Sequence, residues 1–226
     1  MTQSIGENLS KSFGFTKNGL VGHWVRWIIL IILNCIPIVN FIASGYMVKI
    51  YRGGDVAPEL ENYVEMFIDG LKLFIIGLVY SIIPLILIYA VPILGIDPIS
   101  TTGLLLTCIG TVLAIIVGLF ALIATIRFAK MGSMGEAFNF GAISEKIQEI
   151  GWGHYILSYI VLIVVVGVIA GGLSAIATLL LIGAGTTSGI AMGAAVAMIA
   201  FLALLILIPV FMMWQAKYFE NLYSLA

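Results

Sequence analysis

Four long apolar runs without a charged side chain constrain the fold of this chain more than any other feature. They cover residues 73–94, 103–126, 155–182 and 189–214, and none contains Lys, Arg, Asp, Glu or His. A helix needs about 20 apolar residues to cross the hydrocarbon core of a bilayer, so each run is long enough to span it. Every backbone polar group in lipid needs a partner within the protein, and the runs are therefore expected to be helices.

The composition leads to the same fold class. Of the 226 residues, 62% are hydrophobic and 9% are charged, whereas soluble domains carry about 25% charged residues. A soluble domain of this size has too little interior to bury so much apolar surface. We therefore expect an all-α, polytopic integral membrane helix bundle that forms one membrane domain over residues 1–226.

The same composition argues against several classes of function. The formal net charge of −1 offers no basic surface for nucleic acid. Cys35 and Cys108 both lie in apolar segments, and no Cys/His cluster has the spacing of a metal site. The four uncharged runs contain no side chain that can act as a general base. We expect neither enzymatic activity nor a cofactor.

The first apolar segment, residues 24–48, is interrupted at its centre by Asn34, Pro37 and Asn40. Proline removes a helical hydrogen bond and disfavours helix in the residue before it. The segment is either one kinked crossing or two short helices that form a re-entrant hairpin. An interrupted helix exposes backbone groups at membrane depth, where two amides can hold a polar ligand or cap the turn themselves.

The distribution of basic residues predicts the topology. The short loops at 95–102 and 183–188 contain no Lys or Arg, and short basic loops remain cytoplasmic. A single first crossing would place Lys11, Lys17 and Arg26 outside, whereas a hairpin places all ten basic residues inside. The rule favours the hairpin, in the cell membrane, with the N-terminus, the connectors and the C-terminus in the cytoplasm.

A repeated unit organises the chain, because Lys49 and Arg52 end one apolar segment and Arg127 and Lys130 end another with the same spacing. Each unit is a helical hairpin followed by an amphipathic cytoplasmic connector helix. The expected segments are an N-terminal interfacial segment (1–20), the first apolar segment (24–48), a connector helix (49–72), a helical hairpin (73–126), a second connector helix (127–153), a second hairpin (155–214) and a cytoplasmic tail (215–226).

The connectors and the N-terminal segment show apolar residues at helical spacing. These are Val56, Leu60, Val64, Phe67 and Leu71 in the first connector, Phe140, Ile143, Ile147 and Ile150 in the second, and Ile5, Leu9 and Phe13 near the N-terminus. The opposite face of the first connector is acidic. That face is either simply solvated or binds a basic protein partner.

The stretches "GYMVKIYRGG" (45–54) and "APELENYVEMFIDGLKLFIIGLVYSII" (57–83) resemble an uncharacterised, largely archaeal family of multi-pass membrane proteins, the domain of unknown function 4013. The matching residues are Gly45, Tyr46, Lys49, Arg52, Pro58, Asp69, Gly70, Leu71, Lys72 and Tyr80. The family usually has Leu-Pro where this chain has Ala57-Pro58. The resemblance implies a multi-pass membrane fold and implies no activity.

Small residues recur every four positions within the long runs. They are Gly110, Ala114 and Gly118, then Gly167 and Gly171, then Gly185, Gly189 and Gly193. Such spacing lets membrane helices approach closely, either within one chain or between copies in a homo-oligomer.

Two functions from different classes fit these observations. The first is a membrane scaffold or accessory subunit that acts through the lipid bilayer and through protein partners at the connectors. The alternative is a passive channel or transporter for a small solute, without proton coupling, because the spans have no ionisable residue to carry a proton.

Overall fold

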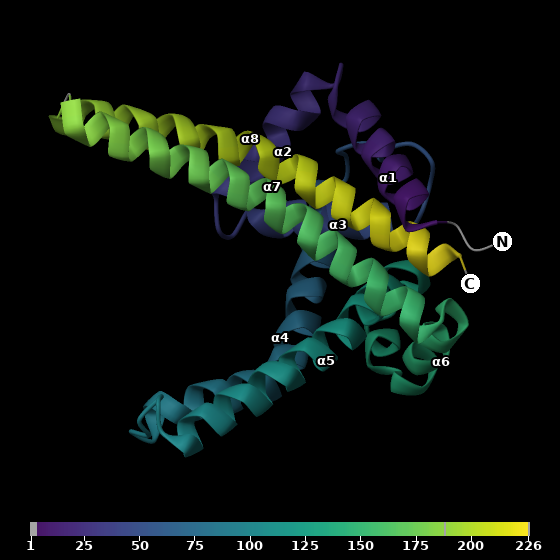
Figure 1. The fold of residues 1–226 in the computed structure, drawn as a ribbon. Helices are drawn as coiled ribbons and strands as arrows, with labels where there is room; N and C mark the ends of the chain where they lie inside the picture. Colours follow the sequence, from purple (N-terminus) through teal and green to yellow (C-terminus); the bar gives the residue numbers. More distant parts are fainter. Residues whose placement is uncertain (1–3, 188, 226) are drawn as a thin grey trace.

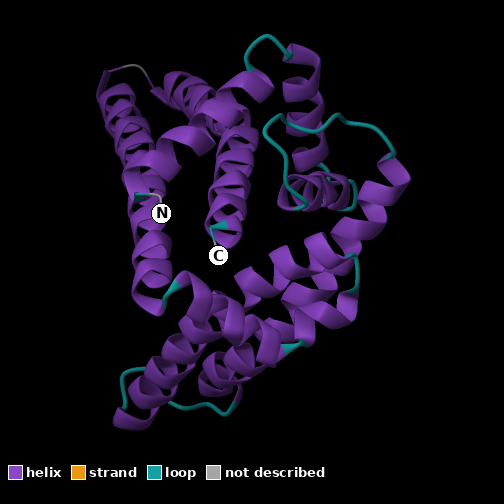
Figure 2. Cartoon of the chain, turned by 90° about the vertical axis from the view of Figure 1, so that its right-hand side faces the viewer, coloured by secondary structure: helices purple, strands orange, loops and turns teal. Residues whose placement is uncertain are grey.

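The computed structural model describes residues 4–187 and 189–225, and within them the side chains of all residues except 173, 176–177, 180–187, 189–194, 196–197 and 200–201. The elements are α1 (Ile5–Leu20), α2 (Trp24–Cys35), α3 (Asn40–Tyr51), α4 (Tyr63–Ile93), α5 (Thr101–Met131), the 3-10 helix η1 (Met134–Phe138), α6 (Phe140–Ile150), α7 (Trp152–Thr187) and α8 (Gly189–Ser224). Helix accounts for nearly all of the described chain (Figure 2).

Two long hairpins, α4–α5 and α7–α8, diverge from a common base (Figure 1). The base is formed by α1, α6, the C-terminal ends of α3, α5 and α8, and the N-terminal ends of α4 and α7. The short helices α2 and α3 lie beside α8, and the start of α1 lies beside the end of α8 at the base. The opposite ends of the two hairpins point away from the base (Figure 1).

Four of the described helices are long and apolar enough to cross a membrane: Tyr63–Ile93, Thr101–Met131, Trp152–Gly172 and Leu202–Ser224. A fifth span would require α1 and α2 to act as one, although they are bent by 100° at their junction. The prediction of an all-α membrane helix bundle is confirmed.

The first apolar segment forms two helices rather than one continuous helix. The helix α2 ends at Cys35 and α3 begins at Asn40, so residues 36–39 form a turn around Pro37. Each helix has 12 residues, which corresponds to about 18 Å of length. Neither helix alone covers a hydrocarbon core of about 30 Å.

The prediction of one connector helix over residues 49–72 is wrong. The helix α3 ends at Tyr51, a loop covers 52–62, and α4 begins at Tyr63 and continues into the membrane run without a break. Gly53 and Gly54 have φ values of 99° and 130°, which favour glycine and end a helix. The expected apolar stripe is not buried either, because Val56 and Val64 are exposed.

The second connector contains the amphipathic helix that its spacing predicts, although only over part of the range 127–153. The helix α5 continues to Met131, and η1 and α6 follow. In α6 the side chains of Ile143, Ile147 and Ile150 are buried, while Phe140 is exposed. The apolar face of α6 thus covers the base.

The N-terminal segment is helical, but α1 buries a polar face. Asn8, Ser12 and Thr16 are buried against the base, whereas Phe13 of the expected apolar stripe is about half exposed. The helix packs on the C-terminal end of α8. Those last turns of α8, expected to be a cytoplasmic tail, are instead part of the core.

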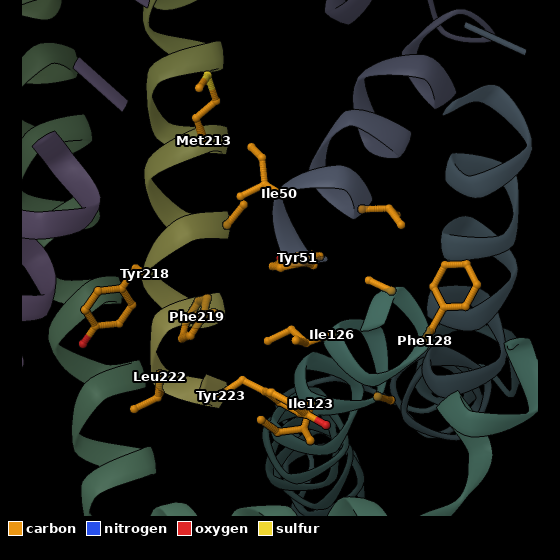
Figure 3. Close-up of a cluster of buried hydrophobic side chains, with 14 of the residues drawn as sticks. Ile50, Tyr51, Ile123, Ile126, Phe128, Met213, Tyr218, Phe219, Leu222 and Tyr223 are labelled. Carbon is orange, nitrogen blue, oxygen red and sulfur yellow. The ribbon is translucent and has the colours of Figure 1, made fainter. Parts of the chain in front are cut away.

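The main cluster of buried apolar side chains lies where α3, α5 and α8 meet (Figure 3). Ile50 and Tyr51 come from α3, and Ile126 comes from α5. Further contributions come from α8, namely Met213, Tyr218, Phe219, Leu222 and Tyr223. Of these, Tyr218 and Leu222 point away from α3, and the Tyr218 hydroxyl donates to the Ser158 carbonyl oxygen of α7. This apolar cluster fixes the helix ends around it and so positions the polar side chains described next.

Candidate functional site

The helices α3 and α4 cross with their backbones in contact. A methyl group on Gly45 would overlap the backbone carbonyl of Met66, and one on Gly70 would overlap that of Phe41. Any larger residue at either position would force the two helices apart. The crossing brings the C-terminal end of α3 against the loop 52–62 and the first turns of α4.

Polar side chains of α3 hold that loop in place. The Tyr46 hydroxyl donates a hydrogen bond to the Pro58 carbonyl oxygen at 2.9 Å. Lys49 Nζ donates to the carbonyl oxygens of Glu59 (3.4 Å) and Glu61 (2.8 Å). These side chains give the loop carbonyls the partners that a helix would otherwise supply.

Arg52 connects the end of α3 to α4. Its guanidinium forms ion pairs with Glu65, at 3.1 Å, and with Asp69, which is buried. Lys72 Nζ lies 3.6 Å from the other Asp69 oxygen. Asp69 therefore has two cationic partners, which offset the cost of burying its charge.

A second charged cluster lies at the end of α8. Glu220 is buried and accepts hydrogen bonds from Lys217 (2.7 Å), Lys130 of α5 (2.9 Å) and Ser224 (2.8 Å). Lys217 Nζ also donates to the Gly54 carbonyl oxygen at 2.8 Å. One carboxylate thus joins α8 to α5 directly and, through Lys217, to the loop that follows α3.

The helix α1 is attached to α8 by amides and hydroxyls. Asn8 Nδ2 donates to the Tyr218 carbonyl oxygen at 3.0 Å, and Asn221 Nδ2 donates to Asn8 Oδ1 at 2.9 Å and to Ser12 Oγ at 3.2 Å. The Trp214 indole donates to the Leu9 carbonyl oxygen at 3.1 Å. The last turns of α8 are therefore the point where α1, α3 and α5 are joined.

The role of these last turns was missed by the sequence analysis, which treated residues 215–226 as a tail. A signal was present: Lys217 and Glu220 are three residues apart, and Tyr218 and Leu222 are four residues apart. That pattern is typical of a helix with a buried apolar stripe and an internal ion pair. Asn8 and Ser12 gave no such signal, because polar residues at helical spacing are usually exposed.

The predicted broken-helix site is held by its own amides. Asn34 Nδ2 donates to the Leu30 carbonyl oxygen at 2.8 Å, and Asn40 Nδ2 donates to Asn34 Oδ1 at 2.9 Å. The two side chains thus bridge the turn around Pro37. This arrangement matches a turn closed by its own side chains and leaves a ligand role for Asn34 and Asn40 as a prediction.

The small residues of the long helices have different surroundings. A methyl group on Gly110 would lie 2.9 Å from Ile88 Cγ1 of α4, so Gly110 marks a close approach of α4 and α5. Ala114 and Gly118 line a shallow groove of about 240 Å³ between the same helices. Among the residues whose side chains the structure describes, none has an atom within 4 Å of a methyl group placed on Gly118, Gly167 or Gly171, apart from the glycine's own turn of helix. Gly185, Gly189 and Gly193 lie outside the residues whose side-chain surroundings are described.

An open apolar groove also lies between α4, α5 and the start of α6. Its volume is about 360 Å³, and Tyr80, Phe120, Phe138 and Phe140 contribute aromatic rings to its walls. The Tyr80 hydroxyl donates to the Ala137 carbonyl oxygen of η1 at 2.7 Å. Tyr80 therefore joins the first hairpin to the second connector.

The residues that carry the family resemblance have structural partners throughout the base. Gly45 and Gly70 form the helix crossing, Tyr46 and Arg52 hold the loop and α4, and Tyr80 binds η1. These contacts explain why the pattern joins glycines, cations and tyrosines over one short stretch. The two charged clusters of the base, around Asp69 and around Glu220, pair each buried carboxylate with two cations.

Comparison with known proteins agrees with the family resemblance described in the sequence. No curated protein and no solved structure matches the chain. The family described as "Protein of unknown function (DUF4013)" matches residues 29–178. This range includes α3, α4 and both stretches, 45–54 and 57–83, that carry the resemblance. The match covers more than half of the chain, and the protein therefore belongs to the DUF4013 family.

Proposed function

We propose that the protein is a membrane scaffold or accessory subunit, which uses the base to hold two hairpins that bind other membrane components. The observation that carries this proposal is the exposure of the hairpins. Only 17–22% of the residues in the most apolar stretches of α4, α5 and Trp152–Gly172 are buried, against 39% for Leu202–Ser224. Most of that surface is available to lipid or to a partner helix.

The separation of the hairpins supports a scaffold over a solute pathway. The hairpins α4–α5 and α7–α8 diverge from the base (Figure 1), whereas a transporter encloses its substrate between packed helices near the bilayer midplane. Several charged side chains of the base form internal pairs, such as Lys130–Glu220 and Arg127–Glu136. This arrangement also favours a protein without enzymatic activity.

The same geometry supports a cytoplasmic base. The ten Lys and Arg residues all lie outside the two hairpin tips at 94–100 and 187–189, and the first tip contains Asp97. Short basic segments remain in the cytoplasm. In this topology the helices α2 and α3 enter the membrane from the cytoplasmic side and return to it.

Cysteine labelling tests the topology. In a variant with Cys35→Ala and Cys108→Ala, Asp97→Cys should react with an impermeant maleimide on intact cells. Lys146→Cys should react only after the cells are opened. Labelling of the two positions from the same side would contradict the four-span arrangement.

Photo-crosslinking tests the scaffold itself. A photoreactive residue at Ile86, whose side chain is 63% exposed on α4, or at Val168, 69% exposed on α7, should give a discrete protein adduct in native membranes. The buried position Ile76 is the matched control and should give none. An adduct of twice the chain mass would identify a homo-oligomer. Lipid adducts alone, together with downhill solute flux through the purified protein in liposomes, would support a passive channel instead.

A further inference from the structure

A cleft lies at the corner where α1 ends and α2 begins, apart from the charged clusters of the base. It has a volume of about 590 Å³ and is lined by His23, Arg26, Glu59 and Tyr63, among other residues. A second hollow of about 260 Å³ shares His23, Arg26 and Glu59 and adds Asp55. Arg26 borders both hollows.

Charges of both signs face these hollows without pairing to each other. The Arg26 guanidinium donates one hydrogen bond, from Nη1 to the Gly19 carbonyl oxygen at 2.9 Å. None of the ion pairs formed by residues 4–187 and 189–225 includes Arg26, Asp55 or Glu59. A ligand that fits here carries a negative group for Arg26 and a positive group for the carboxylates.

The cleft continues into an apolar surface along α2. Val25, which lines the cleft, shares one face of α2 with Ile28 and Ile32, and all three are more than half exposed. Trp24 and Trp27 stack at the start of this helix with ring centroids 5.6 Å apart. Tryptophan is enriched at the boundary between water and lipid. The cleft is therefore positioned to bind a lipid headgroup, and the exposed face of α2 is positioned to contact the acyl chains of the same lipid.

We propose that this cleft binds the headgroup of a phospholipid that carries both a phosphate and a primary ammonium group, as phosphatidylethanolamine does. Arg26 binds the phosphate, Glu59 and Asp55 bind the ammonium group, and the acyl chains lie along α2. An anionic lipid without an amine gains only the contact with Arg26 and is repelled by two carboxylates. A quaternary ammonium headgroup has no N–H to donate to them.

Native mass spectrometry of the purified full chain tests the proposal. After incubation with equal amounts of phosphatidylethanolamine and phosphatidylglycerol, one phosphatidylethanolamine should be retained in preference. Glu59→Gln should lower that preference by about tenfold, because it removes a charge-assisted hydrogen bond to the ammonium group. Glu61→Gln is the matched control, since Glu61 is equally exposed, lies two residues further along and does not line the cleft. Glu61→Gln should retain the preference for phosphatidylethanolamine.

Arg26→Gln should reduce retention of both lipids, with circular dichroism and gel filtration as checks on folding, because Arg26 also binds the end of α1. If Arg26→Gln misfolds, the comparison of Glu59→Gln with Glu61→Gln still tests the proposal. An absence of preference in the parent protein, or an equal fall in Glu61→Gln, would overturn the proposal. Equally strong binding of soluble glycerophosphoethanolamine would also overturn it, because the site would then recognise a soluble phosphoamine rather than a lipid.

Discussion

The base and the hairpin shafts use the same residue types in different ways. In the base, Gly45 and Gly70 bring two helix backbones into contact, and Glu220 is buried between two lysines. In the shafts, a side chain added at Gly118, Gly167 or Gly171 would meet no atom of the described residues within 4 Å. The difference shows that a small residue stabilises this chain only where a second helix crosses it. The glycine substitutions below test that distinction, and the charge substitutions test the role of Glu220.

The largest effect is expected from Gly70→Ala. The added methyl group would overlap the Phe41 carbonyl, so a backbone rather than a flexible side chain must move, and the free energy of unfolding should fall by about 3 kcal/mol or more. Denaturant unfolding in micelles measures it. Gly77→Ala on the same helix is the control, because its methyl group meets nothing within 4 Å. Equal losses for the two variants would remove the distinction between base and shaft.

A loss of about 3 kcal/mol is expected from Glu220→Gln, because it leaves two cations near the end of α8 without their carboxylate. The same unfolding assay measures it. Glu149→Gln breaks a pair with Lys146 in which the carboxylate is half exposed, and it should cost less than about 1 kcal/mol. If both substitutions cost the same, Glu220 is not the residue that joins α5 and α8.

A smaller loss, about 1 kcal/mol, is expected from Gly110→Ala. Its methyl group would lie 2.9 Å from Ile88 Cγ1 and 3.3 Å from Leu87 Cβ, so the contact is with side-chain atoms and is less severe than the backbone overlap at Gly70. Gly118→Ala, two turns further along α5, meets open space and should be neutral. Thermal unfolding in detergent should rank Gly70→Ala, Gly110→Ala and Gly118→Ala in that order, and any other order would contradict the contacts described.

The smallest effect is expected from the double variant Gly167→Ala/Gly171→Ala. Neither methyl group would meet an atom of the described residues within 4 Å, so the free energy of unfolding of the monomer should change by less than about 0.5 kcal/mol. Analytical ultracentrifugation in detergent measures the oligomeric state of the parent protein and of the double variant. A change in oligomeric state would show that a second copy covers this face of α7.

The sequence predicts the membrane class, both long hairpins and the amphipathic α6, because each depends on a local pattern of apolar residues. It does not predict the loop 52–62. Val56, Leu60 and Val64 have helical spacing, but Tyr46 and Lys49 bind the carbonyl oxygens of that loop from another helix. The spacing of apolar residues does not show that side chains of another helix bind the carbonyl oxygens of this segment, because those contacts depend on the fold.

The functional residues were harder to predict for the same reason. Gly45 and Gly70 were noted only as part of a family resemblance, since their contact depends on two helices crossing. The Asn34–Asn40 pair was found because a proline between two amides in an apolar run is a local irregularity. Asn8 and Asn221, which are 213 residues apart, bind each other without any such signal.

The position of α8 as the junction of the base has a consequence for biogenesis. The hydrogen bonds from Asn8 to Tyr218 and from Lys130 to Glu220 join residues 210 and 90 positions apart, and α8 is the last of the helices to emerge from the ribosome. Each hairpin can insert as a local unit, but α1 and the charged ends of α3 and α5 wait for α8. During synthesis Lys130 stays without Glu220, and the N-terminal helix stays undocked. The order of translation therefore places closure of the base after the synthesis of α8.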